Sequence, residues 1–325
     1  MLKKMFVFML SVLSFCCGPQ VAAAVPQALT GIFAHGVGGK AAPLVEQYGA
    51  IFGPLVGRDG PEWDAGVHGS SVGRWRSCLA QQGDIDVIVA QLEERLRDYS
   101  GAGTMLVGVS KGAATMFNTI GYCAEHRPDL LAGLRLVVFD SPFRSPESAA
   151  RQIAYAAAGG VSGWIPWLAG SPIRLIGSLM PDSCSSLGVS AVYRKYDWAG
   201  VTPERSLDGW RNPAIDRDMV IIFIHSQEDA AISVNDSRYL YRELLKLGYK
   251  NVYLIEAKRG RHGAVLWDHD KDAIYYCLDA IYQRHGFSSS SSSVLGLIPA
   301  IRDRELDRVA KPTLEEVAAR IAGRA

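Results

Sequence analysis

A serine between two glycines is the residue of this sequence best suited to act as a nucleophile. Ser110 stands at the centre of Gly-Val-Ser-Lys-Gly, with Gly108 and Gly112 on either side. The apolar run 104–107 before the motif predicts a buried strand, and residues 113–120 after it predict a helix. A turn of this kind strains the serine backbone and exposes its hydroxyl, as in a nucleophile elbow. We therefore predict nucleophilic attack by Ser110.

A nucleophilic serine needs a base, and one of the seven histidines stands out. His262 lies in the loop 259–263, directly after a predicted strand at 251–255. In a parallel sheet the functional groups gather where the strands end, which is where His262 would lie. His225 also closes a predicted strand, but it comes directly before the predicted acid loop and is set aside. We predict that His262 is the general base.

The base in turn needs an acid to orient its ring, and two aspartates follow predicted strands. Asp229 lies in the loop after the predicted strand 219–224. Asp140 ends the preceding predicted strand, 134–139. Asp229 is the preferred candidate, and Asp140 is the alternative acid.

Attack on a carbonyl builds negative charge on its oxygen, and backbone N–H groups that point at this oxygen can stabilise it. One donor should be Lys111, the residue after the nucleophile, at the start of the predicted helix. The second should come from the glycine-rich loop after the predicted strand 28–34, where Val37 is the best placed residue. The small residues of this loop let the backbone approach a substrate, so His35 and Gly36 are predicted to line the binding site.

Composition and charge exclude several classes of partner. The chain has 325 residues, of which 48% are hydrophobic, and a formal net charge of +1. Basic runs with interleaved aromatic residues are absent, so no nucleic-acid partner is expected. The glycine-rich loop matches neither common phosphate-binding pattern, and no cofactor is predicted. The sequence does not determine an oligomeric state.

The start of the chain has the pattern of a targeting signal. Two lysines precede an apolar run at 5–15, and three alanines follow at 22–24. The apolar run is shorter than the roughly 20 residues that a membrane-spanning helix needs. We predict a cleaved secretory signal over 1–24, and hence a secreted or periplasmic protein.

The cysteines leave two questions open. Cys16 and Cys17 could carry a lipid anchor, although the bulky Phe15 before them makes this the less favoured alternative. The remaining four contain no Cys-x-x-Cys pair, so no metal site is predicted. These four are Cys78, Cys123, Cys184 and Cys277. In an oxidising compartment they could form disulfides, or they could be buried thiols.

Strands alternate with helices along most of the chain. Such alternation predicts an α/β fold in which helices cover both faces of a mostly parallel sheet. A weaker strand is predicted at 63–68, and the helix that begins at Ile85 has Asp84 as its expected N-cap. Besides the elements already named, helices are predicted near 237–247 and 270–284.

Residues 144–215 interrupt the alternation and are predicted to form an inserted helical lid. The insertion is rich in apolar residues, among them Trp164 and Trp167. These could form an apolar acyl pocket or a lipid-facing cap, or they could simply pack on the sheet. Six serines at 288–293 predict a flexible linker, and 294–325 a helical tail.

Residues 28–285 resemble the α/β-hydrolase superfamily, in particular its serine esterases and lipases. The resemblance rests on His-Gly-x-Gly at 35–38, Gly-x-Ser-x-Gly at 108–112, Ser-x-x-Asp-x-x-Ile at 226–232, and His262. The chain order of nucleophile, acid and histidine is also that of the superfamily. Two features depart from it: the usual two leading strands are not evident, and Lys111 is an uncommon residue after the nucleophile.

The resemblance implies hydrolysis of an ester, thioester or amide through an acyl-enzyme. Over residues 25–287 we accordingly expect a secreted serine hydrolase that cleaves a carboxylic ester with an apolar acyl group. Substrates would be small-molecule or lipid esters, with Trp164 and Trp167 in contact with them, and the lid could touch a membrane surface. Two alternatives remain: a thioesterase or peptidase with the same residues, and a non-catalytic binding protein on the same scaffold.

Overall fold

The computed structural model describes most of the predicted hydrolase domain. The described residues are 29–36, 48, 51–52, 64–65, 80, 82–98, 103–149, 152 and 200–287. The predictions for the signal peptide, for Val37, for Trp164 and Trp167, and for the linker and tail fall outside these residues. They remain predictions, as does the shortened start of the sheet.

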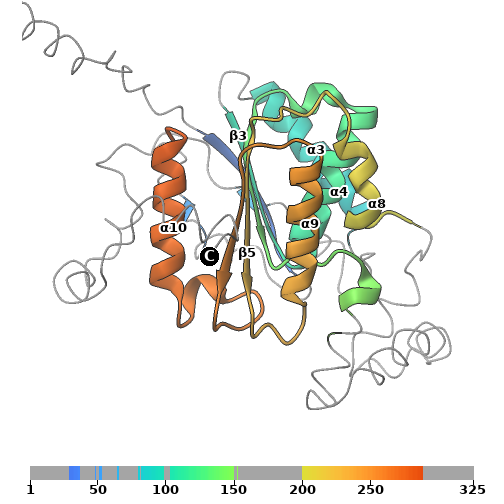
Figure 1. The fold of residues 1–325 in the computed structure, drawn as a ribbon. Helices are drawn as coiled ribbons and strands as arrows, with labels where there is room; N and C mark the ends of the chain where they lie inside the picture. The colour runs from blue at the N-terminus through green and yellow to red at the C-terminus, as the bar shows by residue number, and fades with distance from the viewer. Residues whose placement is uncertain are drawn as a thin grey trace, which may run out of the picture.

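The centre of the molecule is a six-stranded sheet in which every neighbouring pair is parallel (Figure 1). Its strand order is β2-β1-β3-β4-β5-β6, which confirms the predicted parallel α/β architecture. The strands are β1 (Leu29–Ala34), β2 (Asp64–Ala65), β3 (Gly103–Val109), β4 (Leu134–Asp140), β5 (Val220–Ser226) and β6 (Val252–Ala257). Because all of them run the same way, their carboxyl ends meet at one edge of the sheet.

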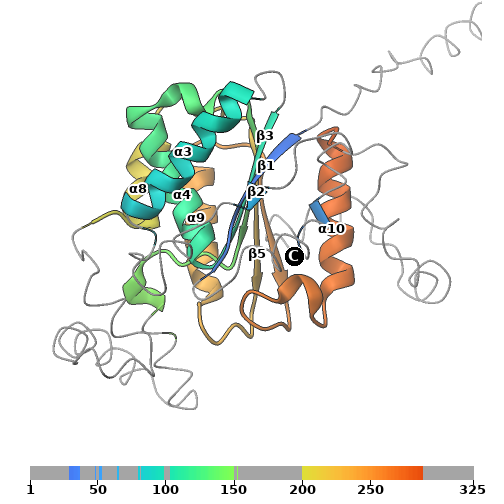
Figure 2. The same cartoon turned by 180° about the vertical axis from the view of Figure 1, so that it is seen from behind.

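Helices cover both faces of this sheet, as Figures 1 and 2 show from opposite sides. Four of the described helices lie on one face: α3 (Gln82–Asp98), α4 (Lys111–His126), α8 (Pro203–Trp210) and α9 (Val234–Lys246). The helix α10 (Lys271–Arg284) lies on the other face. Short 3₁₀ turns, η2 (Pro128–Leu131) and η4 (Val265–Trp267), precede β4 and α10.

The central strands are apolar on both sides because both of their faces are covered. All seven residues of β5 are buried, and its sequence is rich in branched side chains. The one imidazole in this strand, that of His225, is fully buried. A buried imidazole must have hydrogen-bond partners, so its neighbours matter for the site described below.

The helix α8 belongs to the main helical layer, although it lies within the predicted insertion 144–215. Its last residue, Trp210, is fully buried and stacks against Phe117 of α4 at a ring-centroid distance of 4.6 Å. The indole Nε1 also donates to the carbonyl oxygen of Phe117 at 3.0 Å. Residues 200–215 therefore help to hold the nucleophile helix against the sheet.

The predicted N-cap of the second helix is wrong. α3 begins at Gln82, so Asp84 lies inside its first turn. One carboxylate oxygen of Asp84 accepts the backbone N–H of Ala80 at 3.0 Å, and the other accepts from Lys111 Nζ at 3.2 Å. A pattern along one helix could not reveal a partner on a different helix.

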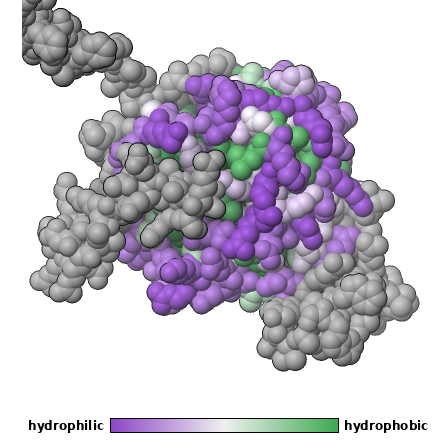
Figure 3. Space-filling model, viewed as in Figure 1, coloured by the Kyte–Doolittle hydropathy of each residue, from purple (hydrophilic) through white to green (hydrophobic). Residues whose placement is uncertain are grey.

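On the face seen in Figure 3, the described residues are mainly hydrophilic, with smaller hydrophobic areas between them. Its exposed large apolar side chains are Leu96 and Leu245, one on α3 and one on α9. Neither extends into a broad apolar patch of large side chains among the residues that the structure describes. Within those residues no helix is long and apolar enough to cross a membrane.

Candidate active site

The turn between β3 and α4 holds Ser110 in a strained conformation. Its φ is 54° and its ψ is −116°, a region that L-residues other than glycine rarely occupy. The two glycines of the motif make the turn possible. A Cβ at Gly112 would lie 2.1 Å from the carbonyl oxygen of Ala34, and one at Gly108 would lie 2.5 Å from the Cα of Ala113. Strand and helix can therefore approach only with glycine at both positions.

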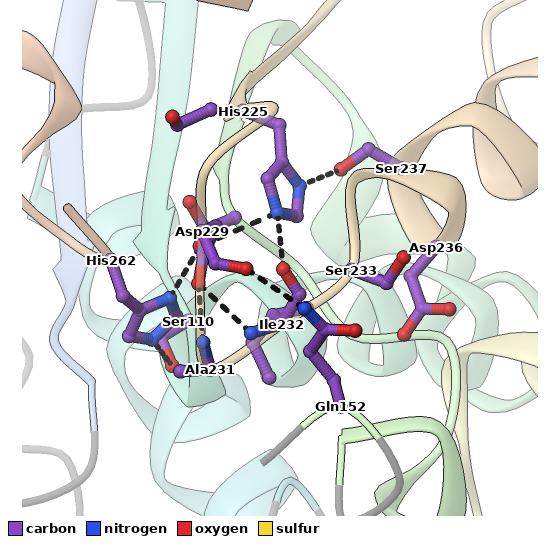
Figure 4. Close-up of polar contacts among 12 residues, drawn as sticks. Ser110, Gln152, His225, Asp229, Ala231, Ile232, Ser233, Asp236, Ser237 and His262 are labelled. Atoms are coloured by element: carbon purple, nitrogen blue, oxygen red, sulfur yellow. Dashed lines mark hydrogen bonds and ion pairs between the residues drawn. The ribbon is translucent and has the colours of Figure 1, made fainter. Parts of the chain in front are cut away.

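Three predicted side chains form one row of hydrogen bonds (Figure 4). The hydroxyl Oγ of Ser110 lies 2.8 Å from Nε2 of His262. The opposite ring nitrogen, Nδ1, lies 2.7 Å from Oδ2 of Asp229. The serine follows β3, the aspartate follows β5 and the histidine follows β6, so the carboxyl edge of the sheet brings all three together.

Backbone N–H groups hold the carboxylate of Asp229. Its Oδ1 accepts from Ala231 N at 2.8 Å and from Ile232 N at 2.9 Å, which leaves Oδ2 for His262. Burial acts to raise the pKa of this carboxyl, but hydrogen bonds from His225, His262 and Ile232 outweigh it. The pKa therefore lies far below that of an ordinary aspartate, and the group is ionised.

The pKa of His262 is shifted in the opposite direction. Burial acts to lower it, but the hydrogen bond and charge of Asp229, together with the charge of Asp140, raise it above the ordinary histidine value of 6.5. A higher pKa makes the neutral ring a stronger base toward the hydroxyl of Ser110. Because Nδ1 faces a carboxylate, it carries the proton, and Nε2 is free to accept from Ser110.

The alternative acid, Asp140, has different partners. Tyr48 donates its hydroxyl to Oδ2 at 2.5 Å, and Ser141 donates to Oδ1 at 2.8 Å. Burial raises the pKa of Asp140 despite these two hydrogen bonds. Among the described residues, His262 makes its carboxylate hydrogen bond with Asp229 and not with Asp140.

The predicted oxyanion donors are described only in part. Lys111 is the first residue of α4, where backbone N–H groups have no acceptor within the helix itself. Gly36 lies directly beside the nucleophile, since a Cβ added there would be 3.2 Å from the Cβ of Ser110. The neighbouring His35 is buried and contacts the carbonyl oxygen of Gly36 through Nδ1 at 2.8 Å. Val37 lies outside the described residues.

The side chain of Lys111 is buried in an ion pair. Its Nζ lies 3.2 Å from Asp84, and the two side chains are only 4% and 2% exposed. Burial raises the pKa of Asp84, although the charge and hydrogen bond of Lys111 act to lower it. The unusual lysine after the nucleophile thus ties the start of α4 to α3, and its ammonium group is buried.

Sequence reasoning missed one residue of the site, His225. Its Nε2 lies 3.4 Å from Oδ2 of Asp229, and its Nδ1 lies 2.7 Å from the hydroxyl of Ser237. The signal was available as a lone polar ring at the end of an apolar strand. The place of His225 directly before the acid loop argues against a role as the base, but it does not exclude contact with the acid itself.

The arrangement suits proton transfer between a serine hydroxyl and an imidazole. An activated nucleophile, an oriented base and a helix N-terminus lie at one edge of the sheet. In the part of the chain that the structure describes, no group of three or more metal-binding side chains is present.

Strand order and site together define the class of fold. Parallel strands, an elbow after β3, an acid after β5 and a histidine after β6 are the features of an α/β-hydrolase fold. The fold that the sequence motifs predict is thereby confirmed.

Comparisons with known proteins give similarity at the level of structure. No family model and no curated protein matches the chain. Among solved structures it is similar to the Pyrococcus furiosus esterase Pf2001, with 13% identity, a TM-score of 0.47, and coverage of 81% of this chain and 83% of the esterase. It is also similar to a Paleococcus ferrophilus monoacylglycerol lipase, with 15% identity, a TM-score of 0.43, and coverage of 81% of this chain and 97% of the lipase. A Pyrococcus horikoshii acylaminoacyl peptidase matches with 17% identity and a TM-score of 0.44, and the match covers 84% of this chain and 40% of the peptidase.

Proposed function

We propose that the protein is a serine hydrolase that cleaves a carboxylic ester through an acyl-enzyme intermediate. The observation that carries this proposal is the unbroken row from Ser110 Oγ to His262 to Asp229, with distances of 2.8 and 2.7 Å. A strained serine, a neutral base and an ionised acid in this order are what acyl transfer requires.

In the first half of the reaction, Ser110 Oγ attacks the carbonyl carbon while its proton moves to Nε2 of His262. The carbonyl π bond breaks, and its electron pair becomes the negative charge of the oxyanion. When the oxyanion collapses, the bond to the alcohol oxygen breaks, and His262 gives its proton to that oxygen. Asp229 stays ionised and stabilises the imidazolium throughout.

In the second half, water replaces the alcohol. His262 removes a proton from the water as its oxygen attacks the acyl carbon, and a second oxyanion forms. Collapse of this intermediate breaks the bond to Ser110 Oγ, which recovers its proton from His262. The products are a carboxylic acid and the free enzyme.

The proposed oxyanion donors are the backbone N–H groups of Lys111 and Val37. In enzymes of this type, removal of one oxyanion donor by mutation raises the activation barrier by about 2.7–4 kcal/mol. His35 and Gly36 would line the substrate site, because Gly36 lies against the nucleophile.

The finer assignments concern residues outside the described part. We propose an apolar acyl group in contact with Trp164 and Trp167, and a lid within 144–215, outside α8, that could touch a membrane surface. Secretion after cleavage near residue 24 is likewise a proposal, based on the composition of residues 1–24.

The test is labelling with a fluorophosphonate, read by intact mass. The wild-type protein should gain one adduct, and Ser110→Ala should gain none. A folded wild-type protein that gains no adduct would contradict the proposal and favour a non-catalytic binding protein. If the wild-type protein is labelled, its rates of hydrolysis of a panel of esters, thioesters and peptides would then decide between the carboxylic esterase and the thioesterase or peptidase alternatives.

A further inference from the structure

His225 is buried behind the proposed triad, on the far side of the acid from His262 (Figure 4). Its ring is 0% exposed, at the end of β5. Both ring nitrogens have partners: Nε2 faces the loop that carries Asp229, and Nδ1 faces Ser237 of α9. The imidazole thus joins the acid loop to a neighbouring helix.

The neighbours of Nε2 determine where its proton lies. This atom is 3.1 Å from the carbonyl oxygen of Ile232 and 3.4 Å from Oδ2 of Asp229. A carbonyl oxygen and an ionised carboxylate can only accept hydrogen bonds. The Nε2 atom must therefore carry a hydrogen, which the two acceptors share.

The partner of Nδ1 supports the same tautomer. Ser237 Oγ lies 2.7 Å away, and a hydroxyl can donate to the lone pair of a neutral ring. Ser237 is itself fully buried, in the first turns of α9. Its hydroxyl keeps the ring plane fixed, so the hydrogen on Nε2 points at the acid loop.

The second acceptor, Ile232, links His225 to Asp229 by another route. The backbone N–H of Ile232 donates to Oδ1 of Asp229 at 2.9 Å, while its carbonyl oxygen accepts from His225. Residues 229–232 thus form a turn held by its own hydrogen bond, and the imidazole faces two of its acceptors, the Ile232 carbonyl oxygen and the Asp229 carboxylate. Removing the ring would take away the donor to the Ile232 carbonyl oxygen and the imidazole beside Oδ2, while Oδ1 would keep its two backbone N–H donors.

We propose that His225 is a positioning residue, which donates through Nε2 to the Asp229 carboxylate and fixes the orientation that His262 requires. This inference rests on the proposed function. Among the described residues, the side-chain partners of His225 are Ser237, Ile232 and Asp229, so its effect on the reaction would be transmitted through Asp229 and His262. A leucine would fill a similar volume without any need for polar partners, so a packing role alone does not require an imidazole.

Three substitutions test this role. His225→Leu removes both nitrogens and should lower kcat roughly ten- to hundredfold, with KM changed by less than about twofold. His225→Gln keeps an N–H near the position of Nε2 and should restore kcat to within about threefold of wild type. Leu240→Ala, at a buried position of α9 outside the site, should lower stability without lowering kcat.

Two kinetic outcomes would overturn the proposal. One is a folded His225→Leu protein with wild-type kcat. The other is an equal loss in the Leu and Gln variants, which would show that an N–H directed at Asp229 does not account for the effect of His225. Ser110→Ala is measured in parallel: wild-type activity that is lost in Ser110→Ala but kept in His225→Leu contradicts only this inference. Activity that survives Ser110→Ala contradicts the proposed function itself.

A measurement on the unmodified protein covers the case in which His225→Leu does not fold. Long-range ¹H–¹⁵N correlation spectra report which nitrogen of each histidine carries hydrogen. We expect hydrogen on Nε2 of His225. A neutral ring with hydrogen only on Nδ1 would leave nothing to donate to Asp229 and would overturn the inference.

Discussion

The two oxygens of the Asp229 carboxylate have separate tasks. Backbone N–H groups occupy Oδ1, and imidazole nitrogens surround Oδ2. Such a division keeps the carboxylate charged and fixes its plane, because rotation would break hydrogen bonds on both oxygens at once. The charge then stabilises the protonated form of His262 and raises its pKa. The pKa of the proposed acid is therefore lowered and that of the proposed base is raised, each by the presence of the other.

The pKa of His262 leads to a prediction about activity and pH. The base must be neutral to accept a proton from Ser110, so kcat/KM should fall as pH decreases through the pKa of His262. That midpoint should lie above 6.5, since the pKa of His262 is raised. The measurement is kcat/KM against pH, with an ester whose leaving group does not titrate in the range. A midpoint below 6.5 would show that Asp229 does not charge-stabilise the ring in solution.

Two aspartate variants decide which acid serves the base. Asp229→Asn should lower kcat by about 10⁴-fold, because an amide favours the wrong tautomer of His262. Asp140→Asn keeps the hydrogen bond between His262 and Asp229, and should cost no more than about tenfold in kcat. The two proteins are matched controls, since each change replaces one buried carboxylate oxygen by an amide nitrogen. A larger loss of kcat in Asp140→Asn than in Asp229→Asn would show that Asp140, at the end of β4, is the acid.

At the scale of elements, the sequence was sufficient to locate the edge of the sheet that carries the proposed site. β3, β5 and β6 are apolar runs that end in polar loops, and parallel strands must end at the same edge of their sheet. Positions near these ends could therefore be predicted without coordinates. Whether Asp229 or Asp140 meets His262 depends on the path of the loops, which the pattern of a strand does not contain.

Two contacts near the site could not be predicted, those of Asp84 and of His225. Asp84 has the residue type of a cap, but burial against Lys111 of another helix determines its actual role. His225 is a ring in an apolar strand, and only the folded loop 226–232 reveals that Asp229 lies within reach. In both cases the partner lies on another element or across a loop, and hydrophobic periodicity carries no information about it.

The ion pair between α3 and α4 yields a prediction about stability. Asp84→Leu removes the carboxylate from a buried ammonium and should lower the free energy of unfolding by about 3–5 kcal/mol. The double change Asp84→Leu with Lys111→Met should recover most of that loss, because no charge then remains in the interface. Urea denaturation of the two single variants and the double variant measures the coupling.

The same double variant separates side chain from backbone at Lys111. The proposed oxyanion donor is the backbone N–H, which both substitutions leave in place. Fluorophosphonate labelling of Ser110 should therefore continue in the folded double variant. In the urea experiment, the double variant could instead lose as much free energy of unfolding as the two single variants combined. That result would show that the charges of Asp84 and Lys111 do not stabilise each other.

At the scale of the molecule, the sheet separates two apolar cores. One lies under α3, α4, α8 and α9, and includes Phe117, Phe139 and Trp210. The other lies on the opposite face, where α10 contributes Leu278, Ile281 and Tyr282. The described site sits at the edge between these two layers, so both must be intact for β3, β5 and β6 to hold their ends in register.

The second core indicates where the chain can be shortened. Leu278, Ile281 and Tyr282 are each at most 2% exposed, and burial of an aliphatic side chain such as Leu278 or Ile281 contributes about 1.5–3 kcal/mol. Loss of this helix would therefore remove a large part of the stability of a typical domain, about 5–15 kcal/mol. Phe287, just after α10, packs against this core: its N–H donates to Tyr282 O at 2.9 Å, and its ring meets that of Tyr282 edge-on.

We therefore expect opposite results from two truncations. A chain that ends at Phe287 should unfold cooperatively within about 2 °C of the full-length protein and should still label at Ser110. A chain that ends at Asp270 lacks α10 and the side chains that it adds to this core, and should neither fold nor label. Thermal unfolding and intact mass after fluorophosphonate treatment measure both. A stop at Phe287 that abolishes labelling would mean that 288–325 is part of the domain, which would contradict its assignment as a linker and tail.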